Sequence, residues 1–386
     1  MTTRLELESA QAEAFACQVA RKFADKKLPP IVLIELFVTE DCTLRCDYCF
    51  VNDKDKSTRM TWEVAKKAID FLVTSSGDER ELHINFFGGE PLMEFPLIKQ
   101  VAEYTRDLTA QIGKTVHYAI TTNGTIMNEE IAWFGREYEF NFMLSIDGDR
   151  YAHDLHRVYA GGRRGSWDAV MDNALPILKN IQKWVGARVT VSPDTARFLS
   201  SGVKTLFDRG VNQFLIGSDT DVLWTREEMN IFASEMHKVV DFYIEAKAEG
   251  LPIRIAEFED TPEQRRAKNS QIWSCDAGKS RISVSASGDL YACSKFVRPF
   301  PGMESCKLGT LDDGFTDVRM RMQFIDSGRD KHPACSDCDA CCTCAGGCPA
   351  TNLHFTGSIY NPTAFQCFVN KLNMDLLTRI HSSEFC

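Results

Sequence analysis

The sequence predicts an α/β fold, in which a partial, TIM-like (β/α)6 barrel is followed by a C-terminal, cysteine-rich domain. Two observations predict it. From residue 31 onward, short β-rich apolar runs alternate with longer helical runs, which is the pattern of β/α units around a parallel sheet. Eight of the 15 cysteines follow residue 330, so a ligand-rich region is separate from the cysteines near the start of the chain.

The periodicity of each run assigns the elements. The expected strands cover residues 31–38, 82–87, 116–121, 140–146, 187–192 and 213–217. The expected helices cover residues 6–26, 62–75, 96–111, 128–137, 167–184, 196–208 and 226–250. We therefore expect four parts: an N-terminal helix (1–30), the barrel (31–225), a connecting helix with a linker (226–272) and the cysteine-rich domain (273–386).

Composition and charge exclude several classes of protein. The 386 residues carry a net charge of -10, and their basic side chains are scattered, so no nucleic-acid partner is expected. No apolar stretch approaches the ~20 residues that span a bilayer, and the N-terminus lacks the features of a signal peptide. We therefore expect a cytoplasmic protein without a membrane partner. Because cytosolic thiols are kept reduced, its cysteines are expected to bind metal.

Three cysteines follow the first expected strand in the spacing C-x3-C-x2-C: Cys42, Cys46 and Cys49. Iron-sulfur cubanes are normally held by four thiolates, so three ligands leave one iron open to a small molecule. Short C-x2-C pairs also occur in structural zinc sites. A zinc site would need a fourth ligand close by, and the next histidine, His83, lies well outside the loop.

Further informative residues lie where later strands are expected to end. Gly88-Gly89-Glu90-Pro91 follows the second strand, residues 122–124 follow the third, and residues 145–148 close the fourth. In parallel barrels, the loops after the carboxyl ends of the strands carry the chemistry. Two adjacent glycines let the backbone approach a ligand closely, and Glu90 adds a negative charge. A simple turn is the alternative interpretation of the glycines.

The cysteine triad on the first loop, together with Gly-Gly-Glu-Pro on the second, resembles radical S-adenosylmethionine (SAM) enzymes. The resemblance implies one [4Fe-4S] cluster whose open iron binds SAM. One electron then cleaves SAM to a 5′-deoxyadenosyl radical, which abstracts a hydrogen from the substrate. The cofactor-binding positions that it implies are Tyr48 near the adenine, Gly88, Gly89 and Glu90 near the methionine amine, and Ser145 and Arg157 near the ribose and carboxylate. Arg157 as a surface charge is the alternative.

The C-terminal cysteines resemble the seven-cysteine pattern of the SPASM extension. The pattern reads Cys275, Gly288-x4-Cys293, Cys335-x2-Cys338-x5-Cys344-x3-Cys348 and Cys367, and a β-hairpin is expected over residues 283–292. The resemblance implies two auxiliary iron-sulfur clusters. By this resemblance, the ligands of the first auxiliary cluster are Cys275, Cys293 and Cys348, and those of the second are Cys335, Cys338, Cys344 and Cys367.

Within this subgroup, the chain resembles anaerobic sulfatase maturases and related peptide-modifying (RiPP) maturases. Two departures stand out. Residues 276–280 contain no thiol, whereas those maturases have a fourth cysteine ligand shortly after the first one. Ser294 follows Cys293, at the position where those maturases have an aspartate that acts as the base. A serine is a poor proton acceptor compared with a carboxylate, which counts against formylglycine formation. The fourth ligand of the first auxiliary cluster stays open: either Cys306, thirteen residues after Cys293, closes the site, or one iron is left free to bind the substrate.

The expected function is oxidative modification of a peptide or protein, by a cross-link or a desaturation, in a radical SAM oxidoreductase. An electron donor such as flavodoxin or ferredoxin is implied. Formylglycine formation and dehydrogenation of a small-molecule alcohol are the enzymatic alternatives, and an electron carrier is the non-enzymatic one. No catalytic residue is assigned: Asp219 and Asp221 at the end of the sixth strand are either reactive or solvated, and His153 and His156 either neighbour the cofactor or lie on the surface.

Overall fold

A computed structural model describes residues 28–51, 54–261, 264–265, 275–297, 306–342, 344 and 346–383. The helix expected over residues 6–26 lies outside the described residues. The described strands form one sheet in the order β11-β10-β9-β8-β1-β2-β3-β4-β5-β6-β7. Their bounds are β1 Leu33–Thr39, β2 Glu81–Gly88, β3 Thr115–Thr122, β4 Asn141–Ser145, β5 Gly186–Val191, β6 Gln213–Ser218, β7 Arg254–Ile255, β8 Arg281–Val284, β9 Asp289–Tyr291, β10 Lys307–Thr310 and β11 Gly314–Phe315.

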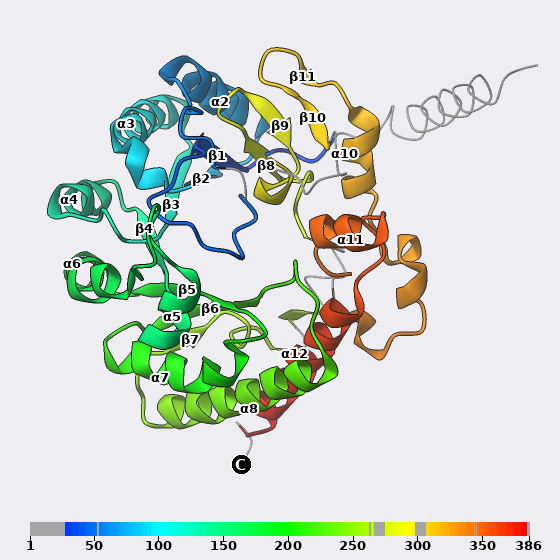
Figure 1. Ribbon diagram of the computed structural model, residues 1–386. Coiled ribbons are helices and arrows are strands. Elements are labelled where there is room, and N and C mark those ends of the chain that lie inside the picture. Colours follow the sequence, from blue (N-terminus) through cyan, green and yellow to red (C-terminus); the bar gives the residue numbers. More distant parts are fainter. Residues whose placement is uncertain are drawn as a thin grey trace, which may run out of the picture.

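Strands β1 to β7 pair in parallel, and the helices between them cover the outer face of the curved sheet (Figure 1). This arrangement confirms the predicted partial barrel. The six expected strands are all present, with ends that differ by at most two residues. The helices of the barrel are α2 Trp62–Ser75, α3 Phe95–Ile112, α4 Glu129–Glu137, α5 Arg150–His156, α6 Leu175–Ile181, α7 Leu199–Asp208 and α8 Arg226–Ala248.

Local chemistry accounts for most helix ends. Thr61 caps α2 by accepting a hydrogen bond from the backbone N–H of Val64, and Thr225 with Glu228 forms a capping box at the start of α8. The helix expected over 167–184 is shorter and irregular. It includes a π-helical turn at Ala169–Ala174 and ends at Ile181. Periodicity alone does not reveal such a turn, because it inserts one residue without changing the apolar composition.

The C-terminal region continues the barrel sheet. Strand β8 pairs in parallel with β1, with Leu33 opposite Arg281 and Leu36 opposite Val284, and β9 pairs antiparallel with β8 as the predicted hairpin requires. Helices α10 Val318–Ile325, α11 Pro349–Thr356 and α12 Ala364–Ser383 then close the open side of the curved sheet (Figure 1). The cysteine-rich region is thus joined to the first strand of the barrel.

Alternation along β1 separates two packing environments. Ile34, Leu36 and Val38 belong to the main core, whereas Phe37 packs in a small cluster with Val51 and Val297. Successive side chains of a strand point to opposite faces, so Glu35 and Phe37 face the inside of the barrel. Glu35 there accepts hydrogen bonds from the Ser283 hydroxyl and from the backbone N–H of Ser294.

None of the described helices is both long and apolar enough to cross a membrane.

Candidate active site

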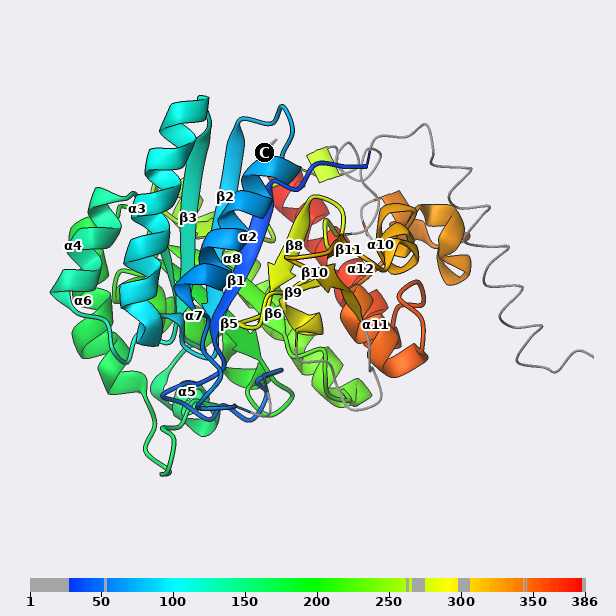
Figure 2. The same cartoon turned by 90° about the horizontal axis from the view of Figure 1, so that it is seen from above.

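One cavity opens at the carboxyl ends of the parallel strands, and residues from the ends of β2 to β6 and from several of the loops that follow the strands line it. Seen along the sheet, the loop after β1 and helix α5 lie together at this end of the barrel (Figure 2). The cavity has a volume of about 310 Å³, which falls within the range of small-molecule sites. The three triad cysteines line it, together with Lys295 from the C-terminal region. The predicted location of the chemistry therefore coincides with an enclosed space.

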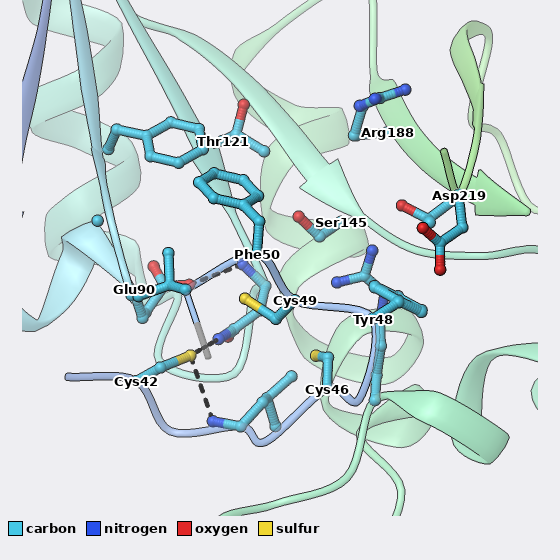
Figure 3. Close-up of a pocket in the computed structure, with 18 of the residues that line it drawn as sticks. Cys42, Cys46, Tyr48, Cys49, Phe50, Glu90, Thr121, Ser145, Arg188 and Asp219 are labelled. Carbon is cyan, nitrogen blue, oxygen red and sulfur yellow. Dashed lines mark hydrogen bonds between the residues drawn. The ribbon is translucent and has the colours of Figure 1, made fainter. Parts of the chain in front are cut away.

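The triad cysteines lie on the loop that follows β1 (Figure 3). The Cys42 sulfur accepts hydrogen bonds from the backbone N–H of Leu44 (3.4 Å) and from the Asn123 amide (3.5 Å). Lys54 donates one to the sulfur of Cys49 (3.1 Å). Burial raises the pKa of the Cys46 thiol to about 12. Nearby donors or cations are therefore needed to stabilise thiolates here, and bound iron would supply the strongest such interaction.

The triad thiols do not converge, within the described residues, as the ligands of one metal ion would. Among the described residues, no three His, Cys, Asp or Glu side chains form a group that could hold one metal ion. Thiolates of an iron-sulfur cluster each take a different iron, so they stand farther apart than the four ligands of one zinc. The arrangement gives no support to the zinc alternative.

The two glycines after β2 let that loop lie directly against the cysteine loop. The backbone N–H of Gly89 donates to the Thr39 carbonyl (2.8 Å), and that of Glu90 donates to the Asp41 carbonyl (2.8 Å). A β-carbon on Gly88 would lie 2.2 Å from the Thr39 carbonyl oxygen, and one on Gly89 would lie 1.9 Å from that of Asp41. Gly88 also has a φ of 143°, which favours glycine. Both positions therefore require glycine.

Glu90 is a buried carboxyl group at the wall of the cavity, 1% exposed. It accepts hydrogen bonds from the Thr122 hydroxyl (2.7 Å) and from the backbone N–H groups of Asn123 (2.8 Å) and Leu92 (3.2 Å). Burial raises its pKa to about 7, although these hydrogen bonds act in the opposite direction. The group is thus fixed in position and is poised to bind a cationic or hydrogen-bond-donating ligand.

Arg157 is buried, which contradicts the surface-charge alternative. Its guanidinium donates two hydrogen bonds to Asp147 (2.7 and 3.0 Å), and it lies over the ring of Tyr48 at 5.4 Å from the centroid. The Tyr48 hydroxyl also donates to Asp147, and so does the backbone N–H of Thr190 (2.8 Å). Burial favours neutral Asp147, but Arg157 outweighs it and lowers the pKa of that carboxyl. Asp147 is a site residue that sequence reasoning did not single out.

His153 and His156 are both buried, so the surface alternative is contradicted for each. The ring of His156 is held between Asp47 (2.8 Å) and Asp194 (3.1 Å). His153 hydrogen-bonds the Ser166 hydroxyl (2.8 Å), and burial lowers its pKa to about 3. Neither histidine lines the cavity. They brace α5 and the adjacent loops, which hold Asp147 and Arg157.

The loop after β6 links the cavity to the C-terminal region. Asp219 lines the cavity at 6% exposure, and burial raises the pKa of its carboxyl (Figure 3). The backbone N–H of Asp221 donates to Asp219 (3.0 Å), while the Asp221 carboxylate pairs with Lys295 (2.8 Å). Thr351 of α11 also donates to Asp221 (3.1 Å). Asp219 and Asp221 thus both line the cavity, and Asp221 forms a half-buried ion pair with Lys295. Lys295 carries no motif in the sequence.

The C-terminal cysteines gather in two places. Four of them line one small pocket of about 30 Å³: Cys335, Cys338, Cys344 and Cys367. Cys275, Cys293 and Cys348 are close enough to interact electrostatically: burial raises the pKa of the Cys293 thiol, and Glu35, Cys348 and Cys275 raise it further. Cys348 also lines a space of about 230 Å³ with Ser218 and Thr220, which line the main cavity as well. Cys306 is buried at the start of β10, next to Tyr291.

A buried carboxyl group on the last barrel loop predicts a pH-dependent stability. Burial raises the pKa of Glu257 from 4.5 to about 7, so its ionisation costs more in the folded state than in the unfolded state. Stability is then lost as the pH rises from about 4.5 to about 7, and about 2 kcal/mol of that loss falls above about pH 5.5. Glu257→Gln is expected to remove that part of the slope in urea unfolding, whereas the exposed Glu245→Gln on α8 should keep it. Equal slopes in both variants would contradict the prediction.

Comparison with known proteins identifies the class. Residues 36–194 match the family model of the radical SAM superfamily. An uncharacterized protein of Methanocaldococcus jannaschii is 30% identical over 282 residues, which cover 72% of this chain and 88% of that protein. The chain belongs to the radical SAM superfamily. SAM and one [4Fe-4S] cluster are the cofactors of this class, and the triad and the cavity fit them.

Within the superfamily, the chain is similar to maturases. The cysteine-type anaerobic sulfatase-maturating enzyme of Clostridium novyi is 22% identical, over 80% of this chain and 85% of that enzyme. The radical SAM cyclopropyl synthase TigE of Paramaledivibacter caminithermalis is 24% identical, over 82% of this chain and 68% of that enzyme.

Solved structures share the fold. The structure of anSMEcpe with bound AdoMet and the Kp18Cys peptide has a TM-score of 0.74 at 20% identity, and covers 92% of this chain and 99% of that one. Streptococcus suis SuiB bound to its precursor peptide SuiA has a TM-score of 0.60 at 15% identity, with coverage of 94% and 81%. The cysteine-rich C-terminal region fits a SPASM domain, as predicted.

Proposed function

We propose that this radical SAM enzyme oxidatively modifies a peptide, by forming a cross-link or a double bond after hydrogen abstraction from a side chain. Its relatives support the proposal: two are named as sulfatase-maturating and cyclopropyl-forming enzymes, and two related structures hold peptides. The single observation that carries it is the cavity, which is lined both by the cysteine triad and by Lys295, a residue that interacts with Cys293.

The cavity residues around the triad have proposed roles in binding SAM. SAM bound at the cluster supplies the radical that removes a hydrogen atom from the substrate. Glu90, fixed by three hydrogen bonds, is placed to accept hydrogen bonds from the methionine amine, and the glycines before it hold the second loop against the first. Tyr48, Ser145 and Arg157 all line the same cavity and suit the adenine, the ribose and the carboxylate. Asp147 positions both Tyr48 and Arg157.

The C-terminal cysteines are assigned to two auxiliary clusters. Cys335, Cys338, Cys344 and Cys367 share one pocket and supply a complete set of four thiolates for one cluster. Cys275, Cys293 and Cys348 supply three for the other, and Cys306 is the proposed fourth. Oxidation of the substrate releases an electron after hydrogen abstraction, and a cluster beside the cavity gives that electron an acceptor. Flavodoxin or ferredoxin is the proposed donor for the triad cluster.

The proton released in the same step needs an acceptor as well. Ser294 occupies the position after Cys293, and its backbone N–H is bound to Glu35. Asp219 lines the cavity from the loop after β6, it is not engaged in an ion pair with Lys295 as Asp221 is, and burial raises the pKa of its carboxyl, which favours proton uptake. We therefore assign the role of general base to Asp219. The likeness to sulfatase-maturating enzymes keeps formylglycine formation as the second candidate.

The test uses anaerobically reconstituted enzyme with SAM and dithionite. Candidate peptides encoded beside its gene are supplied, and the products are analysed by mass spectrometry. The expected result is 5′-deoxyadenosine together with a peptide that has lost two hydrogen atoms. Asp219→Asn is expected to lower peptide oxidation about 100-fold or more, while 5′-deoxyadenosine formation persists. Asp312→Asn, on an exposed loop, serves as the control. Oxidation of an added alcohol, with every peptide left unchanged, would contradict the proposal.

A further inference from the structure

Arg188 is a cation inside the barrel that none of the roles above uses. It lies in the middle of β5, where Ala187 and Val189 are buried in the main core and Arg188 points to the opposite face. That face lines the cavity with the triad (Figure 3). The sheet register places Arg188 between Ser145 of β4 and Leu215 of β6, both of which also line the cavity.

The guanidinium of Arg188 has no close anionic partner among the described residues. Its hydrogen bond goes to the Leu215 carbonyl (3.3 Å), and within the described part of the chain no carboxylate forms an ion pair with it. Glu257 and Asp147 act on it only at longer range, and Asp147 is already bonded to Arg157. Burial lowers the pKa of Arg188, and the neighbouring positive charge of Arg157 acts in the same direction. A buried charge without a counter-charge destabilises the folded protein, unless a ligand of opposite charge binds it.

The backbone next to Arg188 is shaped to hold this side chain. Gly217 lies beside the guanidinium, and a β-carbon there would come within 2.4 Å of one of its terminal nitrogens and 2.9 Å of its central carbon. A planar guanidinium presents its donors as a fork that matches a carboxylate. The Ser145 hydroxyl on the adjacent strand adds a neighbouring donor.

We propose that Arg188 forms a carboxylate-binding subsite of the cavity, which selects a substrate with an acidic group near the reacting carbon. The inference rests on the proposed peptide substrate, so the acidic group is an aspartate or glutamate side chain or a C-terminal carboxylate. Arg188 bonds the Leu215 carbonyl on β6, whereas Arg157 bonds Asp147 and lies over the ring of Tyr48, although the two guanidinium groups are near enough to interact. The methionine carboxylate of SAM is the other source of the same chemistry, and the test separates the two.

The experiment measures binding of two capped tripeptides, acetyl-Ala-Glu-Ala-amide and its Gln isostere, to reconstituted enzyme loaded with SAM. Calorimetry gives the Kd of each peptide and, separately, of SAM. The Glu peptide is expected to bind the wild-type enzyme about tenfold or more tightly than the Gln peptide, the effect of one charge-assisted hydrogen bond. Arg188→Met is expected to remove this preference without changing the Kd of SAM, and Arg188→Lys should keep part of it.

A second variant tests the same subsite in case Arg188→Met does not fold. Gly217→Ala keeps the positive charge but pushes the guanidinium aside, so it should weaken the Glu peptide selectively. Equal affinity of the wild-type enzyme for both peptides, or a preference that survives Arg188→Met, would overturn the subsite. A weaker Kd for SAM in Arg188→Met, with the peptide preference intact, would assign the carboxylate to SAM and overturn it too. If neither peptide binds at all, the proposed peptide substrate fails instead.

Discussion

Cys46→Ser is expected to abolish formation of 5′-deoxyadenosine from SAM. A serine hydroxyl is a far weaker iron ligand than a thiolate, and only three side chains are available to hold the triad cluster. The variant should therefore bind about four irons fewer per chain than the wild type after anaerobic reconstitution. No 5′-deoxyadenosine should be detected, because no other described group can start the radical reaction.

The control is Cys17→Ser, which lies outside every predicted ligand set. It should keep both iron content and SAM cleavage. Circular dichroism should show that Cys46→Ser remains folded, since Cys46 is only partly buried and contributes little to the core. If Cys46→Ser cleaved SAM as fast as the wild-type enzyme, the triad would not be the reactive centre.

Gly89→Ala is expected to lower SAM cleavage by about 100-fold or more, although it adds only a methyl group. The β-carbon would lie 1.9 Å from the carbonyl oxygen and 2.5 Å from the carbonyl carbon of Asp41, and 2.7 Å from the oxygen of Glu40. All three atoms belong to the backbone, so the cysteine loop itself has to move. A misplacement of about 1 Å at a reacting centre costs about 100-fold in rate.

Gly162→Ala is the matched control, because its nearest neighbour would be the backbone nitrogen of Arg164 at 3.9 Å and its φ is ordinary. SAM cleavage, Kd for SAM and iron content should be measured for both variants. For Gly89→Ala we expect weaker SAM binding with most of the iron retained. Unchanged SAM cleavage in Gly89→Ala would show that the contact between the two loops has no part in the chemistry.

The sequence predicted the barrel well because its signals are local. Each strand and helix is one periodic segment, and the triad occupies a single loop directly after β1, so its place at the carboxyl end of the sheet follows from the fold class. The predicted class is confirmed by the fold and the family. The individual ligand and cofactor-binding residues stay predictions, which the variants above test.

Other site residues depend on contacts that no local pattern encodes. Asp147 and Lys295 become informative only once Arg157 and Asp221 are placed beside them. The sequence around Arg188 gives a weak indication of a site. It places a charged residue between apolar neighbours in a parallel strand, where both faces are normally apolar. The pairing of β8 with β1 joins segments so far apart that the hydrogen bond from Ser283 to Glu35 spans 248 residues.

That pairing has a consequence for synthesis of the chain. The ribosome releases β1 long before it makes β8, so one edge of the growing sheet has exposed N–H and C=O groups until almost three quarters of the chain has been translated. Open strand edges invite pairing with other chains. High-level expression should therefore favour aggregation of nascent chains, and truncation before residue 281 should leave an insoluble barrel instead of a smaller working enzyme.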